Sequence, residues 1–351
     1  MSAPLPDATG LIDACAAAGM RLVVVATGGG SEALSHLVTC PGASQVVLEG
    51  AVPYARAAVD DWLGGSPETY CSSRTARLLA MAAWQRARVL AERDRAVRDP
   101  NAAACGVAIT AGLRTRRPKR GQHRVFVAVQ RLAITRVAEL VLEKEARSRA
   151  EEERLAAALV LALLAAEAGC SGVEANVAMP ARLRPGEAVR DDRFVPPVAW
   201  QELLGGSRVA VLAEAAVEAR PASGGLIFPG SFNPLHEGHR RMAVIAEEIA
   251  ERPVEFELSI TNVDKPALDA MELAERTAQF IVAGPAARRL WLTRAPTFLD
   301  KVEVFPESTF VMGADTYVRL ADPRYYGGSH EAARDAAPHR AVHQGADRVR
   351  P

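Results

Sequence analysis

Neither sign of charge is in excess in this chain, and no apolar run is long. Its 351 residues carry 42 Lys+Arg against 42 Asp+Glu, which excludes a globally basic nucleic-acid-binding protein and an acidic disordered chain. The most apolar stretch, 155–166, is too short to cross a bilayer. The N-terminus lacks the basic and apolar regions of a signal peptide. We therefore predict a cytoplasmic protein that binds neither nucleic acid nor membrane.

Cysteine is also scarce. The five cysteines are odd in number and widely spaced, and they form no Cys-x-x-Cys pair or His/Cys group at zinc-ligand spacing. This pattern excludes a small disulfide-stapled fold and predicts reduced thiols, with no metal held by protein ligands. At about 100–200 residues per domain, the length predicts two domains.

Short β-branched runs alternate with helical patterns, which predicts an α/β fold in both domains. In the first half we expect strands at 21–26, 45–48, 107–110 and 124–130 and helices at 32–38, 55–62 and 74–94. The pattern at 134–168 predicts one long helix that Gly169 ends. A second alternation of strands and helices runs through 224–228, 255–261, 272–282, 289–294, 298–304, 309–312 and 315–320.

Composition sets the expected boundaries. We predict an N-terminal domain at 8–168, a connecting segment at 169–223, a C-terminal domain at 224–328 and a disordered tail at 329–351. The connecting segment is rich in proline but is not a plain linker, because its apolar residues at 200–204 and 209–212 can still pack. The tail has only two aliphatic residues larger than Ala and no regular period.

The sequence Gly-Ser-Phe-Asn-Pro-Leu-His-Glu-Gly-His at 230–239 directly follows an apolar strand. Gly230 lets a ligand approach the backbone closely, and the free N–H groups where a turn enters a helix bind anions. His236 and His239 lie three residues apart, so both face one side of the first helical turn, with about 5–6 Å between their Cβ atoms. Both imidazoles can then donate to one triphosphate. The arrangement suits nucleotidyl transfer, in which positioning and charge stabilisation dominate.

These ten residues resemble the motif of the HxGH nucleotidyltransferase superfamily, and most closely that of its nicotinamide-nucleotide adenylyltransferases. The resemblance implies a Rossmann-like domain in which His236 and His239 are catalytic and contact the phosphates of ATP. It also implies nucleotide contacts from Gly230, Ser231, Phe232, Asn233, Lys265, Gly313 and Asp315, with Arg276 as a further basic residue. The implied partners are ATP with Mg²⁺, held mostly by phosphates and water, and nicotinamide mononucleotide, which would give NAD and pyrophosphate.

The superfamily closes its site with Ile-Ser-x-Thr-x-x-Arg, and no such motif follows Asp315. We therefore expect either that the gene is truncated or frameshifted near Gly328 or that another segment replaces the motif. On either expectation, the activity of this particular chain is in question.

A second glycine-rich turn, Thr27-Gly28-Gly29-Gly30-Ser31, follows the first predicted strand. Together with Pro41-Gly42 and Tyr54, it resembles the C-terminal domain of competence/damage-inducible protein A, the nicotinamide-nucleotide amidohydrolase family. Active members carry a nucleophilic Ser here and a Lys five residues after the Tyr. In this chain Val59 holds the Lys position, and either Thr27 or Val25 holds the Ser position, depending on the alignment.

Val59 cannot activate a hydroxyl nucleophile, so two interpretations of this turn stay open. It is either a phosphate site or a purely structural turn. The site would comprise Thr27, Gly28, Gly29, Gly30, Ser31 and Tyr54. The basic loop 114–124 is expected to be a solvated hairpin tip, or else a phosphate or subunit contact, and His123 is expected to be exposed and not a ligand. The long Ala-rich helix favours a homo-oligomer.

Three functions compete on this sequence. The leading hypothesis is adenylyl transfer from ATP to nicotinamide mononucleotide. The alternatives are hydrolysis of nicotinamide mononucleotide by the N-terminal domain and non-catalytic nucleotide binding by two degenerate sites. Within the first hypothesis, CTP as the donor and another phosphate as the acceptor stay open, because the HxGH motif serves those reactions too.

Overall fold

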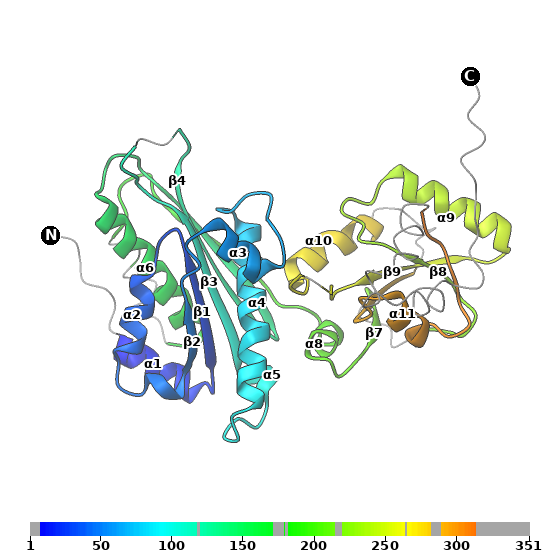
Figure 1. Ribbon diagram of the computed structural model, residues 1–351, viewed down its shortest axis with the longest axis horizontal. Helices are drawn as coiled ribbons and strands as arrows, with labels where there is room; N and C mark the ends of the chain where they lie inside the picture. The colour runs from blue at the N-terminus through cyan, green and yellow to red at the C-terminus, as the bar shows by residue number, and fades with distance from the viewer. Residues whose placement is uncertain are drawn as a thin grey trace. The chain divides into compact units, whose positions relative to one another are not determined.

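The computed structural model describes residues 8–117, 120–170, 179, 182–214, 220–263, 265–281 and 289–313. The chain divides into two compact units, one of residues 1–196 with 264–271 and the other of residues 197–263 with 272–351. Each unit has its own sheet and its own covering helices (Figure 1). The predicted α/β class with two domains is therefore confirmed.

The N-terminal unit is built on a six-stranded sheet in the order β2-β1-β3-β4-β5-β6. Its strands are β1 (Arg21–Thr27), β2 (Val47–Ala51), β3 (Ala104–Gly112), β4 (His123–Arg131), β5 (Ile134–Leu142) and β6 (Val189–Phe194). The strand β1 runs parallel to both β2 and β3, and the other pairs are antiparallel. Residues 22–26 of β1 are all buried, as expected for a strand covered on both faces.

Helices cover both faces of this sheet (Figure 1). One face carries α1 (Ala8–Ala17), α2 (Glu32–Val38) and α6 (Arg149–Glu167), and the other carries α4 (Ser73–Glu92) with the shorter α3 (Arg56–Leu63) and α5 (Pro100–Ala103). A short 3₁₀ helix, η1 (Ala43–Gln45), precedes β2. Ser148 and Glu151 form a capping box at the start of α6, which satisfies N–H groups that the helix itself leaves free.

The predicted single helix at 134–168 is wrong. Residues 134–142 form β5, and α6 begins only at Arg149. Buried and exposed positions largely alternate along β5, which is the period of a strand. Cross-strand pairing with β4, from Arg131 opposite Ile134 to His123 opposite Leu142, overrides the helical preference of the local Ala, Glu and Leu residues.

The C-terminal unit has a five-stranded sheet in the order β11-β8-β9-β10-β7. The strands are β7 (Ala210–Leu212), β8 (Leu226–Pro229), β9 (Val254–Ser259), β10 (Leu290–Thr293) and β11 (Thr309–Phe310), and all pairs are parallel except β10 with β7. The helices are α8 (Val198–Gly205), α9 (Glu237–Ala250), α10 (Ala270–Ile281) and α11 (Phe298–Val304). Within the segments predicted to pack, 200–204 and 209–212, the residues Trp200, Leu203, Leu204, Val211 and Leu212 are buried, whereas Val209 is 62% exposed.

Alternate residues of the central strands face opposite sides of this sheet. On one side Ile227 and Trp291 pack in a core with residues of α11 and β11. The same side holds a buried ion pair, in which Lys301 Nζ lies 2.9 and 2.8 Å from the carboxylate oxygens of Glu257. On the other side Phe228 stacks on Phe256 with ring centroids 5.4 Å apart.

Several predictions about the C-terminal end and the domain boundaries are not tested by the structure. The predicted tail 329–351, the segment 315–320 and Asp315 lie outside the described residues. Within the described residues, no helix is both long and apolar enough to cross a bilayer. The predicted domain boundaries at 168 and 224 stay predictions, while the contacts of the chain divide it near residue 196.

Candidate functional site

The motif at 230–239 lies at the point where the strand order of the C-terminal sheet reverses. The strand β8 lies between β9 and β11, so the chain leaves β8 on one side and returns on its other side at β11. In such sheets ligands bind in the crevice outside the carboxyl ends of the strands at this switch point. Gly230 directly follows β8, and Gly313 follows β11 after Val311, whose N–H donates to Ile227 O. The topology therefore brings Gly230 and Gly313 to the same edge.

The turn after β8 is built around the ring of Phe232. This ring is fully buried, and its centroid lies 5.3 Å from those of Phe256 and Phe280. Phe232 has a φ of 45°, which is uncommon for a residue with a side chain. A Cβ atom at Gly230 would lie 2.6 Å from two ring carbons of Phe232. Gly230 is therefore required for the turn to close over this ring.

His236 and His239 are held together by the start of α9. His236 is the N-cap residue, and its N–H donates to Nδ1 of His239 at 3.3 Å. The two imidazoles stack with centroids 3.8 Å apart, and a Cβ atom at Gly238 would lie 3.0 Å from the ring of His236. Partial burial, and then the charge of His236, lower the pKa of His239. The structure thus brings the two predicted catalytic imidazoles together, with His236 exposed and His239 half-buried.

Residues of α10 that the motif does not include hold the turn. Arg276 Nη1 donates to Ser231 O at 2.9 Å. The side-chain amide of Gln279 accepts from the N–H of Leu235 at 2.7 Å and donates to Phe232 O at 3.3 Å. No sequence motif predicts these contacts of Gln279, because they join segments more than forty residues apart.

The remaining predicted nucleotide contacts divide into three groups. Ser231 and Asn233 are exposed on the turn. Lys265 belongs to the N-terminal unit by its contacts, and its role at the nucleotide stays a prediction. Asp315 lies outside the described residues, whereas Gly313 follows β11.

The N-terminal unit has a cavity at its own switch point. The strand β1 lies between β2 and β3, and Thr27 at its end pairs with Thr110. A cavity of about 250 Å³ opens beside these residues. It is lined by Thr27, Gly28, Tyr54, Arg56, Val59, Tyr70, Cys71, Thr110, Ala111, Leu113, Thr115 and Arg149. The cavity therefore includes three of the six residues of the predicted phosphate site, and Gly29, Gly30 and Ser31 do not line it.

The other glycines of the turn serve close packing. A Cβ atom would lie 2.5 Å from Leu113 Cδ1 at Gly29 and 2.4 Å from Ile109 Cδ1 at Gly30. The hydroxyl of Ser31 donates to Glu153 Oε1 at 3.0 Å. These contacts favour a structural role for Gly29, Gly30 and Ser31.

Positive charge and hydroxyl groups characterise this cavity. Arg56 and Arg149 line it, and none of its lining residues is acidic. Arg149 Nη2 donates to Gly28 O at 3.1 Å, and the guanidinium of Arg56 lies 5.1 Å from the centroid of the Tyr70 ring. The buried hydroxyl of Thr110 has no hydrogen-bond partner among the described residues. These features suit an anionic ligand with hydrogen-bond acceptors.

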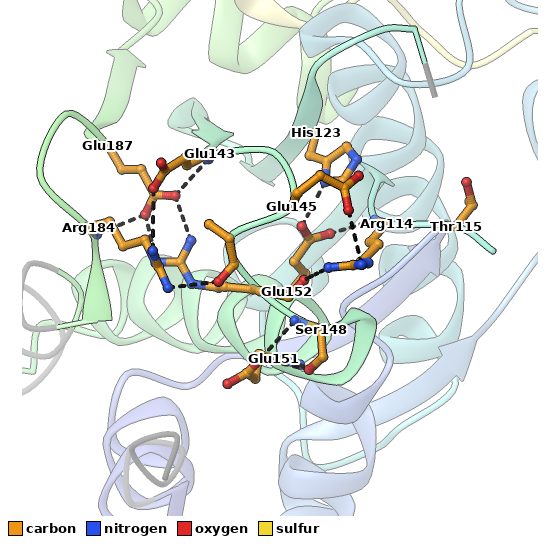
Figure 2. A network of polar contacts seen from close by, with 12 residues as sticks. Arg114, Thr115, His123, Glu143, Glu145, Ser148, Glu151, Glu152, Arg184 and Glu187 are labelled. Carbon is orange, nitrogen blue, oxygen red and sulfur yellow. Dashed lines mark hydrogen bonds and ion pairs between the residues drawn. The ribbon is translucent and has the colours of Figure 1, made fainter. Parts of the chain in front are cut away.

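The prediction that His123 is exposed is wrong. Its side chain is 1% exposed, and its Nδ1 lies 2.7 Å from Glu152 Oε1. Figure 2 shows His123 and the N–H of Arg114 both directed at Glu152. The hairpin returns His123 to the sheet as the first residue of β4, opposite Leu142, which a reading of the basic loop alone does not reveal.

A larger cavity of about 530 Å³ lies beside this network, near the start of α6, and four arginines line it. Three of them are paired with carboxylates, among them Arg149, which lies 3.7 Å from Glu153. Arg114 lies 3.0 Å from Glu145, and Arg147 lies 2.6 Å from Glu187. These ion pairs favour a structural role for this side of the basic loop. Among the described residues, no group of three or more His, Cys, Asp or Glu side chains is arranged to hold a metal ion.

Comparisons with known proteins gave one family match and several similar solved structures. Residues 227–336 match the family model described as cytidylyltransferase-like. Solved structures similar to the chain include competence-damaged protein (CinA) superfamily proteins from Escherichia coli (18% identity, 47% of this chain, 94% of that chain, TM-score 0.36) and Enterobacter cloacae (19%, 48%, 96% and 0.37). Another is the competence/damage inducible protein CihA from Agrobacterium tumefaciens (24%, 47%, 98% and 0.35).

A search of curated proteins found no match. At these identities and TM-scores, the likeness to solved structures assigns no activity to the N-terminal unit. The family match rests on a segment that begins in β8 and includes the whole motif at 230–239. The C-terminal part of the chain is therefore a cytidylyltransferase-like domain, which supports nucleotidyltransferase activity in general.

Proposed function

We propose that the C-terminal unit transfers an adenylyl group from ATP to nicotinamide mononucleotide, giving NAD and pyrophosphate. The observation that carries this proposal is the stacked pair of imidazoles at the start of α9, beside the switch point of a parallel sheet. Helix starts and switch points are both favourable places for phosphate groups. The resemblance of 230–239 to the adenylyltransferases supplies the choice of substrates.

In this reaction the acceptor phosphate attacks the α-phosphorus of ATP, the bond to the β-phosphate breaks, and pyrophosphate leaves. Negative charge grows on the leaving phosphates. His236 and His239 donate to these oxygens, and a protonated imidazole stabilises the added charge. Gly230 lets the turn close over the ring of Phe232, and the nucleotide would lie along the backbone of Ser231 and Phe232.

Mg²⁺ would enter with the nucleotide. The donor set at the turn fits this arrangement, because imidazole nitrogens are poor Mg²⁺ ligands and the exposed Ser231 and Asn233 offer only neutral oxygens. When bound, the ion would be held chiefly by phosphate oxygens and water and would neutralise part of their charge. The side chains of this unit then need only to orient the triphosphate.

The direct test is pyrophosphate release by the purified chain from ATP and nicotinamide mononucleotide. We expect release by the wild type and its loss in His236→Ala and His239→Ala. The exposed Arg240 on the same helix provides the control, and Arg240→Ala should keep activity. Wild-type protein that binds ATP but releases no pyrophosphate would reject catalysis and leave the binding-only alternative. Thermal shifts with ATP and CTP identify the donor, and a panel of phosphate acceptors tests the mononucleotide.

A second candidate function belongs to the N-terminal unit. We propose that its cavity binds a phosphorylated ligand without hydrolysing it. Two arginines, the unpartnered hydroxyl of Thr110 and the lack of acidic lining residues support binding. Val59 lines the cavity where the amidohydrolase family carries Lys, and among the described residues no Lys, His, Asp or Glu lines the cavity to act as a base. This argues against the amidohydrolase alternative, which ammonia release from nicotinamide mononucleotide would revive.

Cys71 lines the same cavity and reports its occupancy. We expect inorganic phosphate or nicotinamide mononucleotide to slow alkylation of Cys71 by iodoacetamide. Burial raises the pKa of the Cys15 thiol to about 12, so Cys15 should react slowly in every sample and serves as an internal control. In Arg56→Gln with Arg149→Gln, protection of Cys71 should disappear. Equal protection in wild type and variant would reject the anion site.

A further inference from the structure

Side chains of helix α10 hold the turn after β8 by contacting its backbone. Three successive contacts are made. Arg276 donates to Ser231 O, Gln279 donates to Phe232 O, and Gln279 accepts from the N–H of Leu235. A fourth contact comes from Phe280, whose ring meets that of Phe232 edge-on. One face of α10 thus contacts the turn from Ser231 to Leu235, the residue before His236.

Arg276 is committed to this task by its own partners. Its Nε and Nη2 donate to Glu272 Oε1 at 3.0 and 2.7 Å, and its side chain is 8% exposed. Because the guanidinium joins Glu272 to a backbone carbonyl, it has little surface left for a ligand. This differs from the sequence expectation that Arg276 is a basic residue of the nucleotide site.

The turn has reason to need such support. Phe232 adopts a left-handed backbone conformation, which persists only where the surrounding structure holds it in place. The ring of Phe232 lies 5.2 Å from that of His239, so a shift of the turn displaces the imidazole as well. The polar contacts of α10 lie on both sides of this residue.

We infer that Arg276 and Gln279 are positioning residues of the nucleotidyl-transfer site, which keep the turn and the imidazole pair in register, and that Arg276 does not bind the triphosphate. The inference rests on the proposed function for its kinetic consequence only. Its structural content, that α10 sets the environment of His239, holds with no substrate present.

The first experiment uses the full chain without nucleotide. Histidine NMR titrations compare wild type with Gln279→Ala, Gln279→Met and Ala278→Ser. We expect the pKa of His239 to move upward in Gln279→Ala, because a released turn lets the imidazole leave its buried, stacked place. Gln279→Glu adds a negative charge that itself raises the pKa of a nearby imidazole, so the matched variant is Gln279→Met. It loses both hydrogen bonds at a similar side-chain length and should shift the pKa in the same direction as Gln279→Ala. Ala278 is exposed on the same helix, so Ala278→Ser should change nothing.

An unchanged His239 titration in a folded Gln279→Ala variant would overturn the inference. If Gln279→Ala unfolds, as circular dichroism would show, Gln279→Met decides. A shift of His239 in that variant supports the inference, and none overturns it. These readouts do not depend on catalysis, so they stand even if the wild type forms no pyrophosphate. Failure of the wild type to form pyrophosphate would count against the proposed function and not against this inference.

The second experiment separates positioning from phosphate binding at Arg276. Arg276→Lys keeps the charge but cannot bridge Glu272 and Ser231 O in the same geometry. We expect kcat to fall by roughly 10²-fold, the scale of small misplacements in an active site, while KM for ATP changes much less. Arg276→Gln should behave alike. If Arg276→Lys has wild-type kinetics and Arg276→Gln has a raised KM for ATP, Arg276 acts as a phosphate-binding charge, and the inference is rejected.

Discussion

Replacement of Gly230 by Ala perturbs the turn after β8 most directly. The added Cβ would lie 2.6 Å from two carbons of the Phe232 ring and 3.1 Å from a third. Carbon atoms do not approach this closely, so the ring or the backbone must move. The ring is fully buried, with Phe256 and Phe280 packed against it, and it has little room to withdraw.

Overpacking of this kind costs about 1–3 kcal/mol of folding free energy. We therefore expect Gly230→Ala to lower the free energy of unfolding of the C-terminal unit by that amount in urea titrations. Nucleotide affinity should fall as well, because a displaced Phe232 moves the adjoining turn and the ring of His239, which it contacts edge-on. The assays are urea unfolding followed by fluorescence and calorimetric titration with ATP.

A control variant and a double variant identify the clash as the cause. At Gly225 the nearest atom to an added Cβ is the end of the Ile227 side chain at 3.2 Å, so Gly225→Ala should cost well under 1 kcal/mol. Phe232→Leu should partly relieve Gly230→Ala, so the two changes should be less destabilising together than the sum of their separate effects, by about 1–2 kcal/mol. A Gly230→Ala variant that is as stable as wild type and binds ATP equally well would refute the described turn.

Three further predictions concern other parts of the chain. In Gly28→Ala, a φ of +74° is combined with a Cβ atom 2.0 Å from a carbonyl oxygen of β3, whereas the Cβ atom of Gly19→Ala, at φ +65°, meets open space. Thermal unfolding should therefore show Gly28→Ala to be more destabilising than Gly19→Ala by at least about 1 kcal/mol. Lys301→Met leaves the buried carboxylate of Glu257 unpaired and should cost about 3–5 kcal/mol in urea unfolding, most of which a second change, Glu257→Leu, should restore. The pKa of His239 is lowered in the free protein, and bound phosphates favour its protonated form. ATP binding should therefore take up a proton, and the affinity for ATP should fall as the pH rises from about 5.5 to about 8. Calorimetry in buffers of different ionisation enthalpy measures this uptake, and proton release would contradict the prediction.

The location of the site could be predicted from sequence because its determinants are local. The apolar run at 224–228 is followed by Pro229-Gly230 and then by His236 and His239 at helical spacing. The sixteen residues from 224 to 239 therefore contain the signals for the strand, the turn and the start of the helix. The structure places the motif accordingly, between β8 and α9. The stacking of the two rings also follows from this local geometry.

The rest of the site depends on contacts between distant segments. Gln279 lies on a helix with an ordinary amphipathic pattern, and only the tertiary structure directs its amide to the backbone of 232–235. The same reason explains the wrong helix at 134–142, whose Ala, Glu and Leu residues favour a helix until β4 pairs with them. His123 was misjudged because its partner, Glu152, lies on a helix 29 residues away.

The two units carry their candidate sites at the same topological position. In each, the chain reverses direction across the sheet beside a parallel strand, and a glycine-containing turn lies at that strand's carboxyl end. The N-terminal cavity offers guanidinium groups, which stay charged at every physiological pH and can hold an anion but cannot accept a proton. The C-terminal turn offers two imidazoles, each of which can donate or accept a proton. Amide hydrolysis needs a nucleophile with a base, whereas nucleotidyl transfer needs mainly position and adjustable charge. The division of residues therefore favours binding in the first unit and transfer in the second.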